Sequence, residues 1–467
     1  MHNSKHVLMI AFNYPPLAGM GMLRNLKFAK YLPMFGWLPT VLTVKEPSDK
    51  PLAQAQYWYC DPSLGHLPNV TILRSHHFSQ KSLIKSFLSF RVLCRLFYLS
   101  SDKSSKGQGL KPSVNAAYPE VKRRLMYFFN NWLEFPDNAI GWYPFALRDA
   151  KAYLKKNPVS LIYSSAAPMT SHLIAAKLSQ KTGIPWIADF RDPWSQAHYR
   201  QTSAIRHCLD VWLEKRTIRN ASALITVSEP LADDFLHLHR TFTNKTYVIY
   251  NGYDDDDYPG LQPSTNRPLT ITFTGRMYEI DFISKGRTPE LLFRCLTSLF
   301  QSGTLPRHGI QCLIYGEYPP QLPDMVSRYD LSEVVNLLGS VSVQEAARVQ
   351  QEADVLLLLS WDDRDRKGIL TGKIFEYLGA RKNILSIPYQ NEGVDRILRT
   401  TGAGVTITNE KDGCELLQSW YREIEMHGSL PYRGVLEEIA HYSRKEQTRK
   451  LASIFNDIMK RSRCNES

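Results

Sequence analysis

The chain has 467 residues, of which 43% are hydrophobic, and its 57 Lys and Arg outnumber its 45 Asp and Glu to give a net charge of +12. This composition excludes a disordered chain, and the length exceeds what one hydrophobic core supports, so we expect two or three globular domains. The excess of cations suits phosphorylated substrates, nucleic acid or anionic lipid, and does not choose among them.

Cysteine usage and the N-terminus indicate a compartment. The seven cysteines are scattered, none is part of a CxxC pair, and no two histidines have the spacing of metal ligands. This pattern argues against a disulfide framework or a zinc site and favours a reducing cytoplasm. The apolar run at 6–12 lacks the regions of a signal peptide, and no uncharged run approaches the roughly 18 residues that span a bilayer. We therefore expect a cytoplasmic protein, soluble or peripheral on the inner face of the plasma membrane.

Short apolar runs rich in β-branched residues alternate with helical stretches. Most of these runs are continuously apolar, as strands of a parallel sheet covered on both faces must be. Strands separated by helices imply right-handed βαβ units, so the sequence predicts an α/β fold. The predicted strands are 6–12, 39–44, 160–164, 185–190, 223–227, 247–250, 269–274, 311–315, 335–338, 354–359 and 383–387.

The alternation stops at residues 251–263, which are acidic and rich in Gly and Pro. We interpret this stretch as an interdomain linker, and its run Asp254–Asp257 as linker and helix-capping acids rather than a metal site. The predicted domains are 1–252, 253–435 and a C-terminal helix at 436–467 that packs back on the first domain. An irregular insertion of basic and aromatic residues, at about 70–138, interrupts the first domain and concentrates much of the excess charge.

A glycine-containing loop follows the first strand. Gly19 and Gly21 lie where the strand ends and a helix opens, so a ligand can approach the backbone there. A helix N-terminus offers unpaired N–H groups and the positive end of a dipole to an anion. The alternative is a plain turn between a strand and a helix.

The second half of the chain has a corresponding loop. Gly275 and Arg276 follow the strand at 269–274, and Lys285 and Arg287 come a few residues later. Three cations at the carboxyl end of a first strand can meet a pyrophosphate and stabilise charge on a departing nucleoside diphosphate. The alternative is a solvated basic loop.

Another motif follows the strand at 354–359. Thr371 and Gly372 have the character of a helix start, and their amides could face a phosphate. Lys373 and Glu376 are three residues apart and share one face of that helix. A carboxylate one turn inside a helix mouth can accept hydrogen bonds from both ribose hydroxyls. The alternative is an ordinary surface pair of Glu and Lys.

Two polar segments follow strands of the first domain. His172 comes after the strand at 160–164, and Asp189, Arg191 and Asp192 follow the strand at 185–190. These residues should lie at the carboxyl edge of the sheet, where open α/β sheets bind ligands. The alternatives are a helix-start histidine and an internal network of ion pairs.

Taken together, these motifs resemble the family 4-like retaining glycosyltransferases of the GT-B fold. The resemblance covers nearly the whole chain and is carried by segments 12–19, 26–37, 183–194, 226–232, 250–254 and 372–380. It implies two Rossmann-like domains that face each other across a cleft. It also implies transfer of a sugar from a nucleotide-sugar donor to a glycan or lipid-linked acceptor, with retention of configuration, in surface polysaccharide or glycolipid synthesis.

The resemblance also implies residue roles. Glu376 would hold the donor ribose, and Arg276 with Lys285 or Lys373 would hold the diphosphate, with Arg287 as an alternative second cation. The loop at Gly19 and Gly21 would close over the donor, with Gly275, Thr371 and Gly372 also on the donor side. His172 corresponds to a histidine near the transferred sugar, and Asp189, Arg191 and Asp192 would shape the acceptor side.

The chain departs from the family pattern at one acidic position. Family members often carry two acids eight positions apart around this helix, but Gly368 stands where the first would be. No carboxylate pair stands out as nucleophile and acid, unlike a glycosidase. The family's usual account is front-face attack assisted by the departing phosphate. Neither a metal nor a cofactor is expected, because Arg and Lys carry the phosphate charge.

The segment 81–98 predicts a contact with membranes. On a helix its four cations fall within one arc while Leu, Ile and Phe crowd the rest, as in helices that lie on an anionic membrane. The alternative is a buried helix with a wet stripe. The other readings of the whole chain are a nucleotide-sugar epimerase of the same build and a non-catalytic membrane-binding protein. Nucleic acid is not expected, because the basic region lacks a recognition motif.

Overall fold

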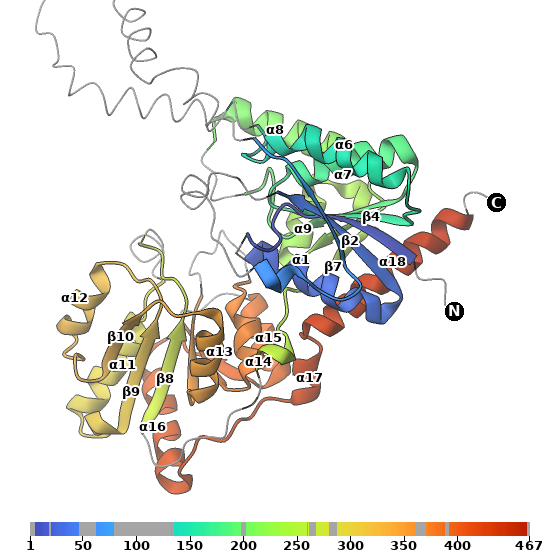
Figure 1. Cartoon of the computed structure of the whole chain (residues 1–467). Coiled ribbons are helices and arrows are strands. Elements are labelled where there is room, and N and C mark those ends of the chain that lie inside the picture. The colour runs from blue at the N-terminus through green and yellow to red at the C-terminus, as the bar shows by residue number, and fades with distance from the viewer. Residues whose placement is uncertain are drawn as a thin grey trace, which may run out of the picture. The chain divides into compact units, whose positions relative to one another are not determined.

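The computed structural model describes residues 5–17, 20–45, 62–78, 132, 135–197, 202–258, 260, 268–279, 287–360, 370–387 and 392–464. They form two compact α/β units, shown in Figure 1. Unit 1 comprises Met1–Thr226, Phe235–Tyr247 and Ala452–Ser467, and unit 2 comprises Val227–Asp234 and Val248–Leu451.

Unit 1 contains a seven-stranded sheet with the strand order β3-β2-β1-β4-β5-β6-β7. Neighbouring strands from β3 through β6 pair in parallel. The order reverses at the first strand, because β1 lies between β2 and β4. The strands are β1 (Lys5–Ile10), β2 (Trp37–Val44), β3 (Thr71–Ser75), β4 (Leu161–Ala166), β5 (Trp186–Phe190), β6 (Ala223–Thr226) and β7 (Thr246–Val248).

Strand β3 lies within the region that the sequence predicts to be an irregular insertion from about residue 70. It pairs with β2 from Thr40↔Thr71 to Val44↔Ser75 and forms the edge of the sheet. Only its last residue is buried. An edge strand with partly exposed side chains has no need of a continuous apolar run, and so the signal used for the other strands is missing here.

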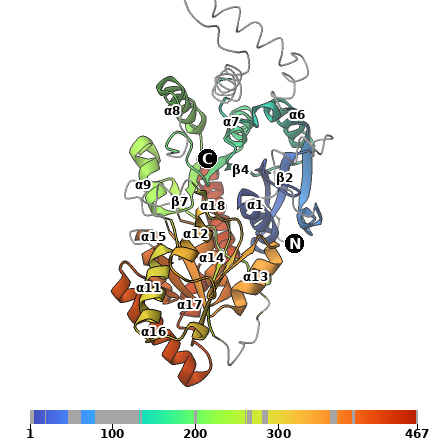
Figure 2. The ribbon, with the colours of Figure 1, turned by 90° about the vertical axis from the view of Figure 1, so that its left-hand side faces the viewer.

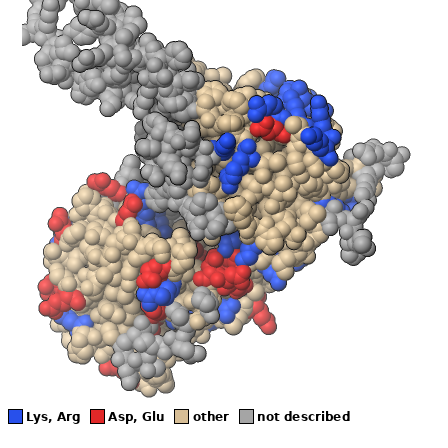
Figure 3. Space-filling view, viewed as in Figure 1, with Lys and Arg blue, Asp and Glu red and all other residues tan. Residues whose placement is uncertain are grey.

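Helices cover both faces of this sheet. Figure 2 shows α8, α7 and α6 side by side along one face, and α6 and α8 both contact α7. The apolar core of unit 1 lies between this layer and the sheet and includes Trp142, Ile174 and Trp186. The helices of unit 1 are α1 (Met20–Tyr31), α6 (Tyr143–Leu154), α7 (Thr170–Thr182) and α8 (Ala204–Ile218). Helix α9 (Glu229–Leu238) begins in unit 2 and belongs to unit 1 from Phe235 onward. Lys and Arg gather over the α6 side of this layer in Figure 3.

Unit 2 repeats the plan with a six-stranded sheet of order β10-β9-β8-β11-β12-β13, in which all neighbouring strands pair in parallel. Its first strand, β8, again lies where the order reverses. The strands are β8 (Leu269–Thr274), β9 (Ile310–Tyr315), β10 (Val335–Gly339), β11 (Val355–Leu359), β12 (Asn383–Ile387) and β13 (Gly404–Thr406). The helices are α11 (Glu290–Gln301), α12 (Gln321–Arg328), α13 (Val343–Glu352), α14 (Lys373–Ala380), α15 (Glu392–Thr401), α16 (Glu410–His427) and α17 (Leu436–Ala440).

Alternate side chains of the central strands of unit 2 enter two different cores. Leu357 and Leu359 of β11 belong to one cluster, whereas Leu356 and Leu358 belong to the other. Both faces of the sheet are therefore buried, and this confirms the interpretation of the continuous apolar runs.

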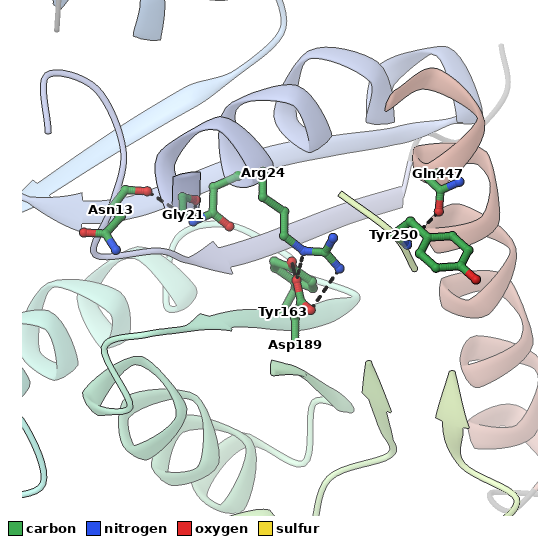
Figure 4. A network of polar contacts seen from close by, with 8 residues as sticks. Asn13, Gly21, Arg24, Tyr163, Asp189, Tyr250 and Gln447 are labelled. Carbon is green, nitrogen blue, oxygen red and sulfur yellow. Dashed lines mark hydrogen bonds and ion pairs between the residues drawn. The ribbon is translucent and has the colours of Figure 1, made fainter. Parts of the chain in front are cut away.

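The last helix, α18 (Arg444–Cys464), contributes to both units. Near its start, the side-chain oxygen of Gln447 accepts the backbone N–H of Tyr250 at 2.9 Å, within unit 2 (Figure 4). From Ala452 onward the helix belongs to unit 1, where the Phe455 ring packs on Trp37 at 5.1 Å. None of the described helices is long and apolar enough to span a membrane.

Six short 3-10 helices complete the described structure. They are η1 (Leu32–Phe35), η2 (Pro62–Gly65), η4 (Ile140–Trp142), η5 (Arg240–Phe242), η6 (Asp255–Asp257) and η7 (Arg307–Gly309). The side chain of Asp254 accepts the N–H of Asp256 at the start of η6, and Asp254 therefore caps this turn as the sequence predicts for the acidic run.

Candidate functional site

The carboxyl edge of the unit 1 sheet begins at the loop between β1 and α1. A Cβ atom on Gly21 would lie 3.1 Å from Asn13 Nδ2 and 3.2 Å from Arg191 Nε, so this position is tightly surrounded. Asn25, one turn further along α1, donates to the backbone oxygens of Asn13 and Gly21 at 3.1 and 3.0 Å. The loop is thus held against α1 while Gly21 lets the side chain after β5 approach.

A fully buried ion pair lies beneath this loop. Arg24 of α1 donates from Nε and Nη2 to the two carboxylate oxygens of Asp189 at 2.7 and 3.0 Å, and neither side chain is exposed (Figure 4). The Tyr163 hydroxyl of β4 donates to the same carboxylate. Burial, followed by the negative charge of Asp189, raises the pKa of Tyr163 well above its usual range. The structure therefore places Asp189 in the interior, where it positions Arg24.

The two charged residues after β5 differ from Asp189 in their exposure. Arg191 pairs with Asp192 through Nη2 and Oδ2 at 2.5 Å, and both side chains are only partly buried. The Arg191 Nε is buried directly beside Gly21 and has no hydrogen-bond partner among the described residues. Gly21, Arg191 and Asp192 therefore come together at the carboxyl edge.

His172 lies in the first turn of α7 but faces the core. Its Nδ1 is 2.7 Å from Ser164 Oγ, its ring centroid is 4.5 Å from that of Phe190, and its side chain is fully buried. Its Nε2 has no hydrogen-bond partner within the part of the chain that the structure describes. Burial lowers the pKa of His172 to about 3, so the imidazole is neutral at ordinary pH. This environment does not favour an acid–base role near neutral pH, and the placement of His172 near the transferred sugar stays a prediction.

Asp137 is a residue that the sequence analysis missed. Its carboxylate accepts the backbone N–H of Thr170 at 3.0 Å, the Thr170 hydroxyl at 2.7 Å and the N–H of Ala139 at 3.0 Å. A carboxylate at a helix N-terminus satisfies unpaired N–H groups and meets the positive end of the dipole. The N-terminus of α7 is thus capped by Asp137. Because Asp137 and Thr170 are far apart in the sequence, their contact could not be predicted from it.

In unit 2, the carboxyl ends of β8 and β11 bring Gly275 and Lys373 into contact. Gly275 has a φ of +125°, and a Cβ atom there would lie 1.9 Å from Lys373 Nζ. The ammonium also lies over the Phe273 ring, 5.7 Å from its centroid. Any other side chain at position 275 would occupy the space of the Lys373 ammonium, so the lysine can lie here only because this residue is glycine.

Arg287 and Glu376 lie near the same ammonium. Burial lowers the pKa of Lys373, the carboxylate of Glu376 raises it, and the guanidinium of Arg287 lowers it. Arg287 is nearly buried, and its Nε donates to the Leu359 backbone oxygen at the end of β11 at 2.9 Å. Two cations and one acid therefore converge at the switch point of this sheet, an arrangement suited to an anion.

Helix α14 is fixed against these strand ends. It begins at Lys373, directly after Thr371 and Gly372, as the sequence predicts. The Tyr377 hydroxyl accepts the backbone N–H of Thr274 at 3.3 Å and donates to the backbone oxygen of Leu357 at 3.2 Å. These bonds join α14 to β8 and β11, and so they hold the helix N-terminus at the carboxyl edge.

Arg276 is more exposed than the other cations of this edge. Its Nε is 2.9 Å from Glu317 Oε2, and both side chains are about half exposed. Its guanidinium lies over the Tyr278 ring, 4.9 Å from the centroid. An exposed ion pair is weak and easily exchanged for another partner, so Arg276 can turn to a ligand.

Some predicted positions lie outside the described residues. These are Gly19, Lys285, Gly368 and the segment 81–98. Within the described chain, no group of three or more His, Cys, Asp or Glu side chains is arranged to hold a metal ion.

Solved structures share this architecture across almost the whole chain. HepE from Anabaena, crystallised with UDP and glucose, superposes with a TM-score of 0.56 at 12% identity, over 97% of this chain and 100% of that one. A glycosyltransferase from Rickettsia africae gives a TM-score of 0.55 at 15% identity, over 98% and 100%. WaaG, a glycosyltransferase involved in lipopolysaccharide biosynthesis, gives 0.50 at 11% identity, over 96% and 99%. The two units therefore have the Rossmann-like architecture of GT-B proteins.

Sequence comparison adds the family. Residues 112–257 match the profile of Glycosyltransferase Family 4. No curated protein sequence matches the chain. The partial profile match and the shared fold together support a family 4-like glycosyltransferase of the GT-B type, an enzyme of the transferase class.

Proposed function

We propose that this glycosyltransferase takes its sugar from a nucleotide-sugar donor held by unit 2. It transfers that sugar, with retention of configuration, to a glycan or lipid-linked acceptor in surface polysaccharide or glycolipid synthesis. The observation that carries the proposal is the convergence of Lys373, Arg287 and Glu376 beside Gly275, at the mouth of α14. The similar HepE protein has been crystallised with UDP and with UDP-glucose, which supports a donor of this class.

The proposed donor pose follows from the charges. The diphosphate meets Lys373, the N-terminus of α14 and Arg276, because a helix N-terminus and cations favour an anion. The ribose hydroxyls donate to the Glu376 carboxylate one turn inside the helix. Arg276 leaves its exposed pair with Glu317 to reach the phosphate. We propose that Arg287, anchored on Leu359, adds to the positive potential.

The proposed chemistry forms a bond between an acceptor oxygen and the anomeric carbon while the bond from that carbon to the phosphate oxygen breaks. The acceptor proton passes to the departing nucleoside diphosphate. Lys373 and Arg276 stabilise the charge that grows on this leaving group, so we propose that transfer needs no metal ion. His172 is buried and neutral, and we assign it to the wall of unit 1 rather than to proton transfer.

Arg191 and Asp192 are the proposed acceptor-side residues. Both reach the carboxyl edge of unit 1, where their partly exposed charged groups support a polar ligand. Asp189 is buried and acts on the acceptor side indirectly, because it holds Arg24 beneath Gly21.

Binding and turnover measurements test the proposal separately. Isothermal titration with UDP, GDP and their sugar conjugates should detect binding by one nucleotide class. Glu376→Ala should raise its Kd by about tenfold or more, because a lost charge-assisted hydrogen bond costs about 1.5–3 kcal/mol. Arg276→Ala should mainly lower kcat, by about a hundredfold, because its contact strengthens as leaving-group charge develops. Release of nucleoside diphosphate should require an acceptor and persist in excess EDTA.

Matched controls are available in the same unit. Glu415→Ala removes an exposed acid of α16, and Arg307→Ala removes an exposed arginine that pairs with Asp330. Both controls should keep wild-type binding and turnover. Binding of no nucleotide, or wild-type kinetics in Glu376→Ala and Arg276→Ala, would place the donor elsewhere. Conversion of the nucleotide sugar without an acceptor would favour an epimerase.

A further inference from the structure

Helix α8 has an inverted distribution of polar and apolar side chains. Its buried positions include Arg206, Asp210, Glu214 and Thr217. Its exposed positions include Ile205, Leu209 and Trp212, which are 66%, 37% and 56% exposed. A surface helix normally turns its apolar stripe inward, so a large exposed apolar stripe indicates an interaction surface.

The inner face of α8 is held by a buried polar network. Arg206 Nε lies 3.0 Å from Asp210 Oδ2, and Arg206 Nη2 donates to the backbone oxygen of Pro136 at 2.7 Å. The indole N–H of Trp194 donates to Asp210 Oδ1 at 3.1 Å. Because these buried charges have partners, the polar side of α8 can face the interior. The apolar side chains of the helix are then left on its outer face.

Glu214 extends this network by one turn. It accepts the backbone N–H of Ser195 at 2.8 Å and lies 2.7 Å from His239 Nε2. Ser195 and Trp194 belong to the loop after β5, which also carries Arg191 and Asp192. The network therefore fixes α8 to the loop that bears the proposed acceptor-side residues.

The exposed charges of α8 are all positive. Both of its acids, Asp210 and Glu214, are buried, whereas Lys215, Arg216 and the C-cap residue Arg219 are exposed. The Arg216 guanidinium lies over the Trp212 ring at 5.5 Å. Cations that flank an apolar stripe containing a tryptophan match the two layers of an anionic membrane surface, the phosphates and the outer acyl region.

More cations lie on the neighbouring helices. Helices α6, α7 and α8 each precede a parallel strand on one face of the sheet, so their C-terminal ends share one edge. The ammonium group of Lys181 lowers the pKa of Lys151 most, and that of Lys177 lowers it further. The surface between α6 and α7 is therefore positive. Figure 3 shows Lys and Arg gathered there.

We propose that the outer face of α8 docks on an anionic lipid bilayer, with Ile205, Leu209 and Trp212 in the interfacial layer and Lys215, Arg216 and Arg219 against lipid phosphates. Docking needs neither donor nor catalysis and so goes beyond the proposed transfer. If the acceptor is lipid-linked, which rests on the proposed function, the network through Asp210 and Glu214 brings the loop after β5 to the membrane surface.

Flotation of the full chain with vesicles tests the surface directly. The protein should bind vesicles of equal parts phosphatidylglycerol and phosphatidylcholine and should bind pure phosphatidylcholine weakly. Leu209→Gln with Trp212→Gln should reduce partitioning more than about tenfold, because two apolar side chains no longer leave water. Arg216→Glu with Arg219→Glu should reduce it and flatten its dependence on salt.

The controls make equivalent changes on other surfaces. Val343→Gln with Met426→Gln removes two exposed apolar side chains of unit 2, and Arg328→Glu with Arg422→Glu makes the same change of charge there. Both controls should bind as the wild type does. Undiminished binding of the α8 variants would overturn the proposal. So would a dimer that Leu209→Gln with Trp212→Gln converts to monomers while vesicles bind neither form. Because no nucleotide is present, these results are independent of the donor experiments.

Discussion

The contact between Arg24 and Asp189 is a fully buried charge pair of unit 1, with both side chains inaccessible and two hydrogen bonds between them. Removal of one partner leaves an uncompensated charge in the interior, which costs about 3–5 kcal/mol. We expect Asp189→Ala to lower the free energy of unfolding by that amount in urea denaturation. Arg449→Ala, which breaks an exposed pair with Glu446, should cost less than about 1 kcal/mol. Similar small losses in both variants would contradict this account.

His172 gives unit 1 a defined response to acid. Its folded pKa of about 3 lies below the usual 6.5, so between these values the unfolded chain binds a proton that the folded chain does not. Stability is complete above about pH 6.5 and falls as the pH drops towards 3, by up to about 1.4 kcal/mol per pH unit. We expect His172→Gln to lose less stability than the wild type between pH 6.5 and 4, in denaturation measured across this range. Parallel pH dependences would show that the imidazole titrates normally.

At the scale of elements, burial decided what the sequence could reveal. The predicted strands all correspond to strands of the structure, and most of them are central strands whose burial on both faces requires a continuous apolar run. The sequence analysis missed β3 and β13, which form one edge of each sheet and are largely half-exposed. Their short, mixed sequences resemble loops, so only pairing with β2 and β12 distinguishes them.

The site was predictable in position but less so in the direction of its side chains. Ends of parallel strands share one edge, and this rule located Gly275, Lys373 and Arg191 correctly at carboxyl edges. It could not show that Asp189 turns inward, because its partner Arg24 lies 165 residues away. The same limit applies to His172, whose inward orientation depends on Ser164 and Phe190.

The junction of β8 with α14 gives a prediction that separates binding from folding. A Cβ atom on Gly275 would displace the Lys373 ammonium, which is the end of a flexible side chain, so the fold should tolerate the change. We expect Gly275→Ala to weaken nucleotide binding about tenfold, with a loss of stability of about 1–2 kcal/mol from its positive φ. Gly303→Ala also places a Cβ atom at a positive φ, +68°, but with open space around it, and should leave binding unchanged. Titration calorimetry and thermal unfolding measure both effects. Unchanged affinity in Gly275→Ala would argue against a role for Lys373.

Across the whole molecule, one plan occurs twice. In each unit the first strand lies at the point where strand order reverses, and a glycine lies after it, Gly21 in the first turn of α1 and Gly275 directly after β8. The charged groups at these two edges differ: unit 1 internalises the Arg24–Asp189 pair, whereas unit 2 leaves Lys373 and Arg287 near one acid. This difference supports the assignment of the anionic donor to unit 2, since cations gathered at one edge attract phosphate.

The C-terminal helix allows the two units to be tested as separate cooperative regions. Phe455 is fully buried against Trp37 and Tyr163 of unit 1, although the start of α18 belongs to unit 2. Replacement of a buried Phe by Ala costs about 3–5 kcal/mol. We expect Phe455→Ala to increase hydrogen exchange in β1, β2 and β4 and to leave β8 and β9 protected, because domains open as local units. Phe293→Ala, in the core of unit 2, should give the reverse pattern. If Phe455→Ala instead exposed β8 and β9, the end of α18 would stabilise unit 2, and the division of the chain into these two units would have to be redrawn.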